Sequence, residues 1–134
     1  MAEFYIVSLR HTMRHDRYIT VWRPNDAGYA YPLSWAGKYP EYSVLNNLSY
    51  YNNGDTTVAV NCEVLDRIAV APAPKMIDGD AGPVVLNKVA SWQEILAHAI
   101  RPTPNEIKPG CKGWRRNHAL QPARIAQAGN GGGA

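Results

Sequence analysis

The segment from Trp22 to Tyr39 constrains the fold of this chain more than any other part of the sequence. Three prolines and two glycines occur between residues 24 and 40, so a long strand or helix cannot continue through it. The region is also rich in large rings, because eight of the thirteen aromatic side chains lie at 22–51. Rings beside turn-forming residues predict an ordered loop that either packs into the core or presents a rigid contact surface lined by Asn25, Asp26, Tyr29 and Tyr31.

Stretches rich in β-forming residues flank this segment and predict a small sheet. Residues 4–9 and 17–22 are separated by a short polar link, as in a hairpin. The second of these strands should end at Pro24, which has no N–H to donate to a neighbouring strand. Residues 56–60 predict a third strand, and residues 84–86 predict a short edge strand. The sequence therefore predicts a largely antiparallel sheet of three to four strands.

Apolar residues at helical spacing predict two to three helices. The expected ranges are 40–52, 62–68 and 91–101. Ser91 and Glu94 match the capping-box pattern, which predicts that the last helix begins at Ser91. The strands and helices together predict an α+β fold with the helices on one side of the sheet.

The length and the charge pattern predict one folded domain followed by a tail. The chain has 134 residues, which suffices for a single domain with its own core. Residues 1–100 carry eight basic and ten acidic side chains, whereas residues 101–134 carry six basic side chains and one acidic one. Prolines and glycines are frequent after residue 101, and few residues there are apolar enough to be buried. We therefore expect a domain at 1–101 and a flexible, disordered basic tail at 102–134.

The sequence has no feature that predicts a membrane or an oxidising compartment. No apolar run approaches the roughly eighteen residues of a membrane span, and the N-terminus lacks a signal-peptide pattern. Cys62 and Cys111 lie far apart in the sequence, which favours free thiols over a disulfide. We expect a cytoplasmic protein with no membrane partner.

Motifs for catalysis or for metal binding are also missing from the sequence. His11 and His15 are four residues apart, but they fall in the polar link and no further ligand completes a metal site. Asp78 and Asp80 lack the remaining oxygen ligands of a calcium loop, and no histidine is near Cys62 in the sequence. We therefore expect no metal, no cofactor and no enzymatic activity.

Part of the aromatic segment carries a resemblance to known proteins. The residues concerned are Trp22-Arg23-Pro24-Asn25, Ala27-Gly28-Tyr29 and Ala36-Gly37-Lys38-Tyr39. They follow the pattern Trp-x-Pro-Asn-x-x-Gly-Tyr and then Ala-Gly-x-Tyr, which resembles a module shared by small uncharacterised proteins of bacteria and their phages. The resemblance covers roughly residues 4–65. It implies a phage or mobile-element setting and adds no catalytic residues. We call these residues the module.

Three functions are compatible with these features. The first, which the resemblance and the small size favour, is a phage or mobile-element accessory protein that binds and inhibits a host protein complex, as an anti-defence inhibitor would. Its partner-binding residues would be Trp22, Asn25, Tyr29, Tyr31 and Trp35. The second is a nucleic-acid-binding module that uses the basic tail, through Lys108, Lys112, Trp114, Arg115 and Arg116. The third is a small enzyme or nucleotide binder that uses His11, Asn25 and Asp26.

Overall fold

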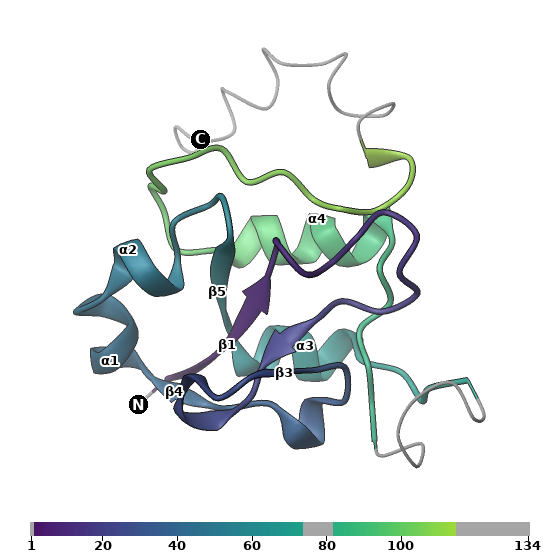
Figure 1. The fold of residues 1–134 in the computed structure, drawn as a ribbon, viewed down its shortest axis with the longest axis horizontal. Helices are drawn as coiled ribbons and strands as arrows, with labels where there is room; N and C mark the ends of the chain where they lie inside the picture. Colours follow the sequence, from purple (N-terminus) through teal and green to yellow (C-terminus); the bar gives the residue numbers. More distant parts are fainter. Residues whose placement is uncertain (1, 74–81, 115–134) are drawn as a thin grey trace.

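A five-stranded antiparallel sheet forms the centre of the protein in the computed structural model, which describes residues 2–73 and 82–114 (Figure 1). The strands are β1 (Glu3–Ser8), β2 (Val21–Trp22), β3 (Tyr29–Ala30), β4 (Tyr39–Pro40) and β5 (Thr57–Asn61). β1 is central and pairs with β5 along most of its length. Its other edge pairs with β4 at Phe4 and with β2 at Val7, and β2 pairs in turn with β3.

Helices cover both faces of this sheet. They are α1 (Glu41–Leu45), α2 (Leu48–Tyr51), α3 (Cys62–Ile68) and α4 (Val89–His98). Because side chains alternate along a strand, Tyr5 and Val7 of β1 lie in one core with residues of α3 and α4. Phe4 and Ile6 lie in a second core with residues of α1 and α2. In Figure 1, α1 and α2 lie to the left of β1, and α4 runs above α3.

The predicted α+β fold is confirmed. The ranges expected for two strands and one helix, 4–9, 56–60 and 62–68, lie close to those of β1, β5 and α3. The helices occupy both faces of the sheet rather than the one face that we expected. Every residue of β1 after Glu3 is buried, so an apolar side chain on either face of this strand needs a covering layer.

Two asparagines divide the predicted helix at 40–52 into α1 and α2. Asn47 has φ −141° and ψ 45°, which lie outside the helical region. Its side-chain amide donates to the carbonyl of Ser43 at 3.0 Å. An asparagine side chain competes with the backbone for such hydrogen bonds, so the helix ends at Asn46 and starts again after Asn47.

The predicted helix at 91–101 begins earlier than expected, and its capping box does not form. The residue before α4 is Lys88, which makes no side-chain hydrogen bond to the helix. Ser91 is buried inside α4, and Glu94 pairs with Arg67 of α3 at 3.0 Å instead of reaching back to the cap. Packing against α3 therefore overrides the local capping pattern.

The segments predicted as strands at 17–22 and 84–86 form shorter pairings. Residues 84–86 make isolated bridges with Tyr18 and with Val70, and only the end of the first segment belongs to β2. Two strands that we did not predict, β3 and β4, lie in the Pro- and Gly-rich segment that was expected to be a loop. Each of them has only two residues, and each pairs with a strand of the predicted hairpin: β3 with β2, and β4 with β1.

Asn52 occupies the outer edge of β5, where the described residues place no further strand. The backbone N–H of Ala59, in the middle of β5, donates to the Asn52 side-chain oxygen at 2.9 Å. The amide group of the same side chain donates to the carbonyl of Ile100 at 2.9 Å. Only 1% of Asn52 is exposed. One buried amide therefore joins the sheet edge to the chain that leaves α4.

Residues 102–114 pack on the domain. Ile107 and Cys111 are buried in the core that α3 and α4 cover, although the sequence predicted few buried residues after 101. The N–H of Asn105 donates to the carbonyl of Asn53 at 3.1 Å. The rest of the predicted tail, 115–134, lies outside the described residues. The domain boundary at 101 stays a prediction.

Candidate functional site

The module forms a tight corner between β2 and β3. The short 3-10 helix η1 (Pro24–Asp26) follows β2 directly, because Pro24 cannot donate to the next strand. The N–H of Arg23 donates to the carbonyl of Gly28 at 2.8 Å. This bond closes the hairpin and leaves Asn25 and Asp26 exposed at its tip.

Asn25 and Asp26 both have left-handed backbone conformations, with φ of 60° and 57°. Such conformations cost about 1 kcal/mol or more for residues with a side chain, although Asn and Asp tolerate them best. Tyr39 holds this turn. The N–H of Asp26 donates to the Tyr39 hydroxyl at 2.9 Å, and that hydroxyl donates to the carbonyl of Arg23 at 2.5 Å. One side chain therefore fixes both ends of the turn.

Gly37 brings the second half of the module against the first. A Cβ at this position would lie 2.8 Å from the Cα of Pro24, so a larger residue would collide with the backbone. The N–H of Gly37 donates to the carbonyl of Trp22 at 2.9 Å. Together with Tyr39, Gly37 docks the Ala-Gly-x-Tyr half of the module on the Trp-x-Pro-Asn half. The two halves are thus one structural unit.

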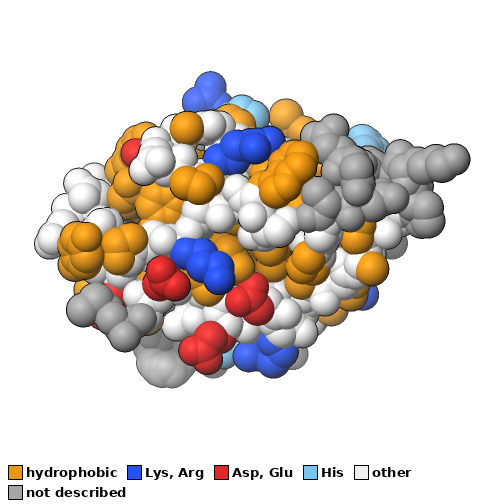
Figure 2. All heavy atoms as spheres, turned by 90° about the horizontal axis from the view of Figure 1, so that it is seen from below, with side chains coloured by type: hydrophobic (Ala, Val, Ile, Leu, Met, Phe, Trp, Pro, Cys, Tyr) orange, Lys and Arg blue, Asp and Glu red, His pale blue; other side chains and the backbone are white. Residues whose placement is uncertain are grey.

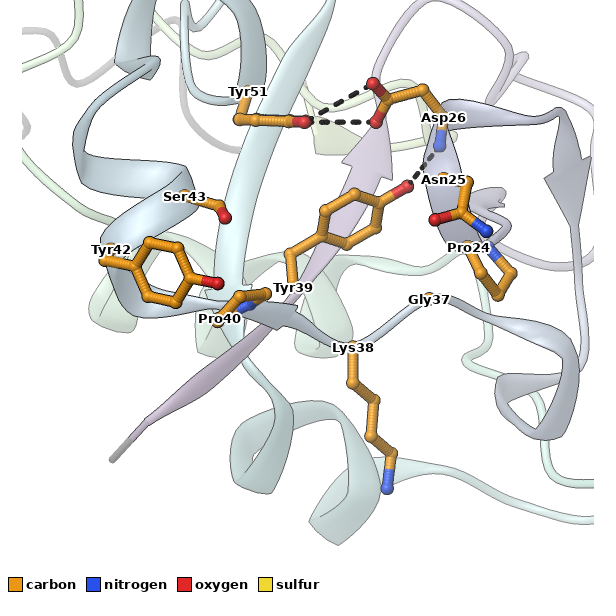
Figure 3. A pocket seen from close by; sticks show the side chains of 10 residues that line it. All are labelled: Pro24, Asn25, Asp26, Gly37, Lys38, Tyr39, Pro40, Tyr42, Ser43 and Tyr51. Atoms are coloured by element: carbon orange, nitrogen blue, oxygen red, sulfur yellow. Dashed lines mark hydrogen bonds between the residues drawn. The ribbon is translucent and has the colours of Figure 1, made fainter.

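An open hollow of about 520 Å³ lies beside this corner, among η1, β4, α1 and α2 (Figure 3). The hydroxyl groups of Tyr39 and Tyr51 point toward Asp26, whereas the side chain of Lys38 extends away from them. Tyr42 lies on the α1 side of the hollow. We call this feature the Asp26 hollow, and its lining consists of Pro24, Asn25, Asp26, Gly37, Lys38, Tyr39, Pro40, Tyr42, Ser43 and Tyr51.

The Asp26 carboxylate is held by a neutral hydroxyl group rather than by a cation. The Tyr51 hydroxyl donates to Asp26 Oδ1 at 3.1 Å and to Oδ2 at 3.4 Å. Burial raises the pKa of Tyr39 to about 12, and burial together with the Asp26 carboxylate raises the pKa of Tyr51. Both phenols therefore stay protonated near neutral pH. In the described part of the chain Asp26 has no ion-pair partner, so the hollow presents a fixed hydrogen-bond acceptor.

Exposed apolar side chains continue from the hollow onto α1 and α2. Tyr42 is 62% exposed, Tyr50 is 51% exposed and Leu45 is 46% exposed. The Trp22 ring lies 5.3 Å from that of Tyr50 and 5.8 Å from that of Tyr51, so Tyr50 rests on an aromatic base. We call Tyr42, which lines the hollow, and the exposed Leu45 and Tyr50 beyond it on α1 and α2 the apolar rim. Exposed rings of this kind are typical of anchor residues at protein interfaces.

The structure divides the five residues that we predicted to bind a partner. Asn25 lines the hollow. Trp22 is half-buried and packs in the core between the sheet and α2, as the core interpretation of the aromatic segment predicts. Trp35 belongs to a second 3-10 helix, η2 (Leu33–Trp35), and the Arg23 guanidinium lies 4.8 Å from its ring centroid. Only Asn25 of these three is part of the hollow.

The two remaining predicted residues face other parts of the molecule. Tyr29 is exposed and stacks on His11, with ring centroids 4.1 Å apart. Tyr31 is half-buried and packs edge-on against Tyr18 at 5.8 Å. The sequence segment that holds the five residues therefore does not form a single surface.

Sequence reasoning missed most of the residues that build the hollow. Asp26 was assigned only to the contact-surface interpretation and to the enzyme alternative, and Tyr39, Tyr42 and Tyr51 were not assigned to a site. One signal was present, because Tyr42 lies off the helical stripe that Val44 shares with the other inward-facing residues. A large ring outside the apolar stripe of a helix indicates an exposed anchor.

The structure describes most of the residues that we assigned to the two alternative functions. Lys108 and Lys112 are exposed, and Trp114 is half-buried against the core. Arg115 and Arg116 lie outside the described residues. For the enzyme alternative, no hydrogen bond among the described residues joins His11 to Asn25 or Asp26. His11 instead lies 3.2 Å from the hydroxyl of Ser8, which is only 1% exposed and therefore closed to a substrate.

Three further features of the described residues bear on the chemistry of the site. Among the described residues no group of three or more His, Cys, Asp or Glu side chains could hold a metal ion. None of the helices of the described residues combines the length and the apolar composition that a membrane span requires. Both cysteines are free and buried, and burial raises the pKa of the Cys62 thiol to about 12 and also raises that of Cys111. Such thiols are poor nucleophiles.

Comparison with known proteins does not assign this chain to a family. No protein-family model, no curated protein and no solved structure matches it.

Proposed function

We propose that this chain is a small accessory protein of a phage or mobile element that binds a host protein complex and inhibits it. A defence system is the proposed class of target, and the cytoplasm of the host cell is the proposed location. The resemblance of the module supports the setting, and the Asp26 hollow with its apolar rim supports protein binding. The proposed action is blocking by occupancy, without catalysis.

The observation that carries this proposal is a carboxylate beside tyrosine rings in a preorganised corner, with the Lys38 side chain extending away from it. A carboxylate beside tyrosine rings suits a guanidinium or ammonium group, because the carboxylate accepts its hydrogen bonds and the rings attract its charge. The volume of about 520 Å³ is in the range of sites that enclose a small ligand or side chain. We propose that the hollow receives an arginine or lysine side chain of the partner, while Tyr42 and Tyr50 contact the surface around it.

This chemistry also explains how binding would inhibit. A complex that acts on nucleic acid uses arginine and lysine side chains to hold the phosphate backbone. A protein that covers one of these side chains with Asp26 and two exposed rings would compete with the nucleic acid for it. The strained turn at Asn25 and Asp26 would be an advantage here, because a carboxylate fixed before binding loses little entropy on binding.

The test is affinity capture from host lysate with three variants of the full chain. Asp26→Asn keeps the size of the side chain and removes its charge, and Tyr42→Ala removes an exposed ring. Both should weaken capture of the partner by about tenfold to a hundredfold, as the loss of an anchor residue does. Glu63→Gln, which removes an exposed acid from α3, is the matched control and should bind normally.

The capture should be repeated after nuclease treatment, since a protein contact survives it. Melting temperatures of the three variants should stay close to that of the parent, because the substituted side chains are exposed. Unchanged capture by both Asp26→Asn and Tyr42→Ala would show that the hollow does not bind the partner.

A further inference from the structure

The polar link between β1 and β2 lies against the C-terminal part of the described chain. Gly110 approaches so closely that a Cβ there would collide with the carbonyl oxygen of Thr12. On another side of the link, the Asn87 side-chain amide donates to the carbonyls of Met13 and Asp16, both at 3.0 Å. Figure 1 shows the loop after β1 beside the segment that leads to residue 114. Three segments far apart in sequence therefore meet at one end of the molecule.

The three segments that meet here carry basic side chains that are far apart in the sequence. All six basic side chains concerned are exposed, and none has an ion-pair partner within the described residues. The same segments carry the acidic residues Asp16 and Glu106, and Asp55 precedes Thr56, whose carbonyl accepts from the N–H of Arg10. Six basic and three acidic residues give this region a net charge of +3, whereas the rest of the described residues hold four basic and six acidic side chains. We call this region the cationic surface, and it consists of Arg10, Arg14, Arg17, Lys88, Lys108 and Lys112.

Another face of the molecule shows the contrast. Seen from below, the side chains of both charges are interspersed with separate groups of hydrophobic ones, and neither sign dominates (Figure 2). A field of one sign is therefore not a general property of this protein. The concentration of basic side chains follows from the contacts of Thr12 with Gly110 and of Asn87 with the polar link.

An aromatic pair adjoins the cationic surface. The ring of His11, which follows Arg10 in the link, stacks on Tyr29 at 4.1 Å and 33°. Tyr29 is 45% exposed, so part of its ring is open to a further stacking partner. Basic side chains beside an exposed ring are the two elements of a single-strand binding surface, because the phosphates meet the charges and a base stacks on the ring.

We propose that the cationic surface, together with Tyr29, binds single-stranded nucleic acid. This is a second binding activity, at a different place from the Asp26 hollow and independent of it. Three of the six basic residues are arginines of one loop, and a guanidinium matches a phosphate with two parallel hydrogen bonds. Met13 is the single large apolar side chain of that loop, which is too little to anchor the surface in a lipid bilayer.

The experiment measures binding of fluorescein-labelled oligothymidylate of about twenty nucleotides to the full chain by anisotropy, at several salt concentrations. If most of the six side chains contact phosphates, the slope of log K against log salt should be near −3 to −4, at about −0.7 for each contact. The triple variant Arg10→Ala, Arg14→Ala, Arg17→Ala should raise Kd at least about tenfold and bring the slope about two units closer to zero.

A matched triple variant controls for net charge. Arg67→Ala, Lys75→Ala, Arg101→Ala removes the same charge from other parts of the chain and should change Kd less than about threefold. Tyr29→Ala should weaken binding and leave the salt slope unchanged, because it removes stacking and no phosphate contact.

Several outcomes would overturn the proposal. Equal losses in the two triple variants would indicate attraction by net charge alone, and loss only in Arg115→Ala, Arg116→Ala would assign binding to the tail. Absence of binding at low salt would exclude the activity. Binding to vesicles with about 30% phosphatidylserine should be measured in parallel. Binding to these vesicles but not to the oligonucleotide would show that the cationic surface binds anionic lipid instead.

Discussion

The Asp26 hollow and the cationic surface are both assembled from distant segments, but they are held in different ways. In the hollow, Tyr39 bonds to two backbone groups of the turn, Tyr51 bonds to the carboxylate, and Gly37 contacts Pro24 directly. At the cationic surface, contacts fix the backbone and none of the six basic side chains is held by an ion pair in the described residues. In the hollow the hydrogen bonds reach the side chains that would meet a partner, whereas at the cationic surface they hold the loop that carries the basic side chains.

This difference indicates two different sources of affinity. A preorganised hollow gains affinity because little has to be ordered on binding, and added salt should weaken its binding only through the single charge of Asp26. A surface of free basic side chains gains affinity from released counterions, and its binding should fall steeply with salt. A change in one region should therefore leave binding at the other intact.

Ending the chain at residue 101 should damage the cationic surface and spare the hollow. The truncation removes Lys108 and Lys112 together with Ile107 and Cys111, which are buried in the core. We expect the 1–101 chain to be less stable than a 1–114 chain by about 3 kcal/mol or more, as judged from large core truncations. Urea unfolding of the two chains measures this. Equal stabilities would confirm the boundary at 101 that the sequence predicted.

Gly37→Ala should damage the hollow and spare the cationic surface. Its new methyl group would meet the Pro24 backbone, which cannot move without opening the corner. We expect a loss of about 2–3 kcal/mol in the free energy of unfolding, within the range of overpacked sites. Ala36→Gly, at the neighbouring position, removes a methyl group instead and is the control. Unaltered stability of Gly37→Ala would mean that the two halves of the module are not in contact.

Tyr39→Phe should loosen the turn and leave the rest of the molecule folded. The change removes the hydroxyl that accepts from Asp26 and donates to Arg23, at an expected cost of about 1–2 kcal/mol. NMR shifts of the Asn25 and Asp26 amides should move, whereas those of loop 10–17 should not.

The same variant should change how stability depends on alkaline pH. The pKa of Tyr39 is about 12 in the folded protein and about 10 when unfolded, so its stabilising effect is complete below pH 10 and is lost between pH 10 and 12. The raised pKa values of Tyr31 and Tyr51 add to this loss. Urea midpoints between pH 9 and 11 should therefore fall less steeply in Tyr39→Phe. Parallel curves would contradict the buried position of this phenol.

Tyr29→Ala should have the smallest effect on stability. The side chain is 45% exposed and its ring contact is with His11, itself exposed, so we expect a loss below about 1 kcal/mol. Thermal unfolding measures it, and partner capture through the hollow should be unchanged. A loss near 3 kcal/mol would place Tyr29 in the core and remove it from the proposed single-strand surface.

Local signals predicted the parts of the fold that local contacts decide. Asparagine is a favoured helix-cap residue, and Asn61 directly precedes the predicted helix at 62–68. Its side chain accepts from the N–H of Glu63 at 2.9 Å. Ser91 and Glu94 gave an equally clear capping signal, but the burial of Ser91 and the ion pair of Glu94 with Arg67 moved the start of α4. A cap is predictable only where tertiary packing does not compete with it.

The two candidate sites depend on contacts that no short sequence pattern encodes. Asp26 meets Tyr39 and Tyr51, which follow it by 13 and 25 positions. Thr12 meets Gly110, which follows it by 98 positions. The aromatic segment predicted an ordered loop rich in rings, but it could not show that Tyr29 turns toward His11 and away from the hollow.

Asn52 has a consequence for the behaviour of this protein at high concentration. An unpaired strand edge is a template on which another chain can add a strand, and repeated addition leads to aggregates. At the middle of β5 the Asn52 amide already takes the hydrogen bond that an incoming strand would need, and its other end is bound to the Ile100 carbonyl. The middle of this edge is therefore already occupied from within the molecule, which disfavours the addition of another strand along β5.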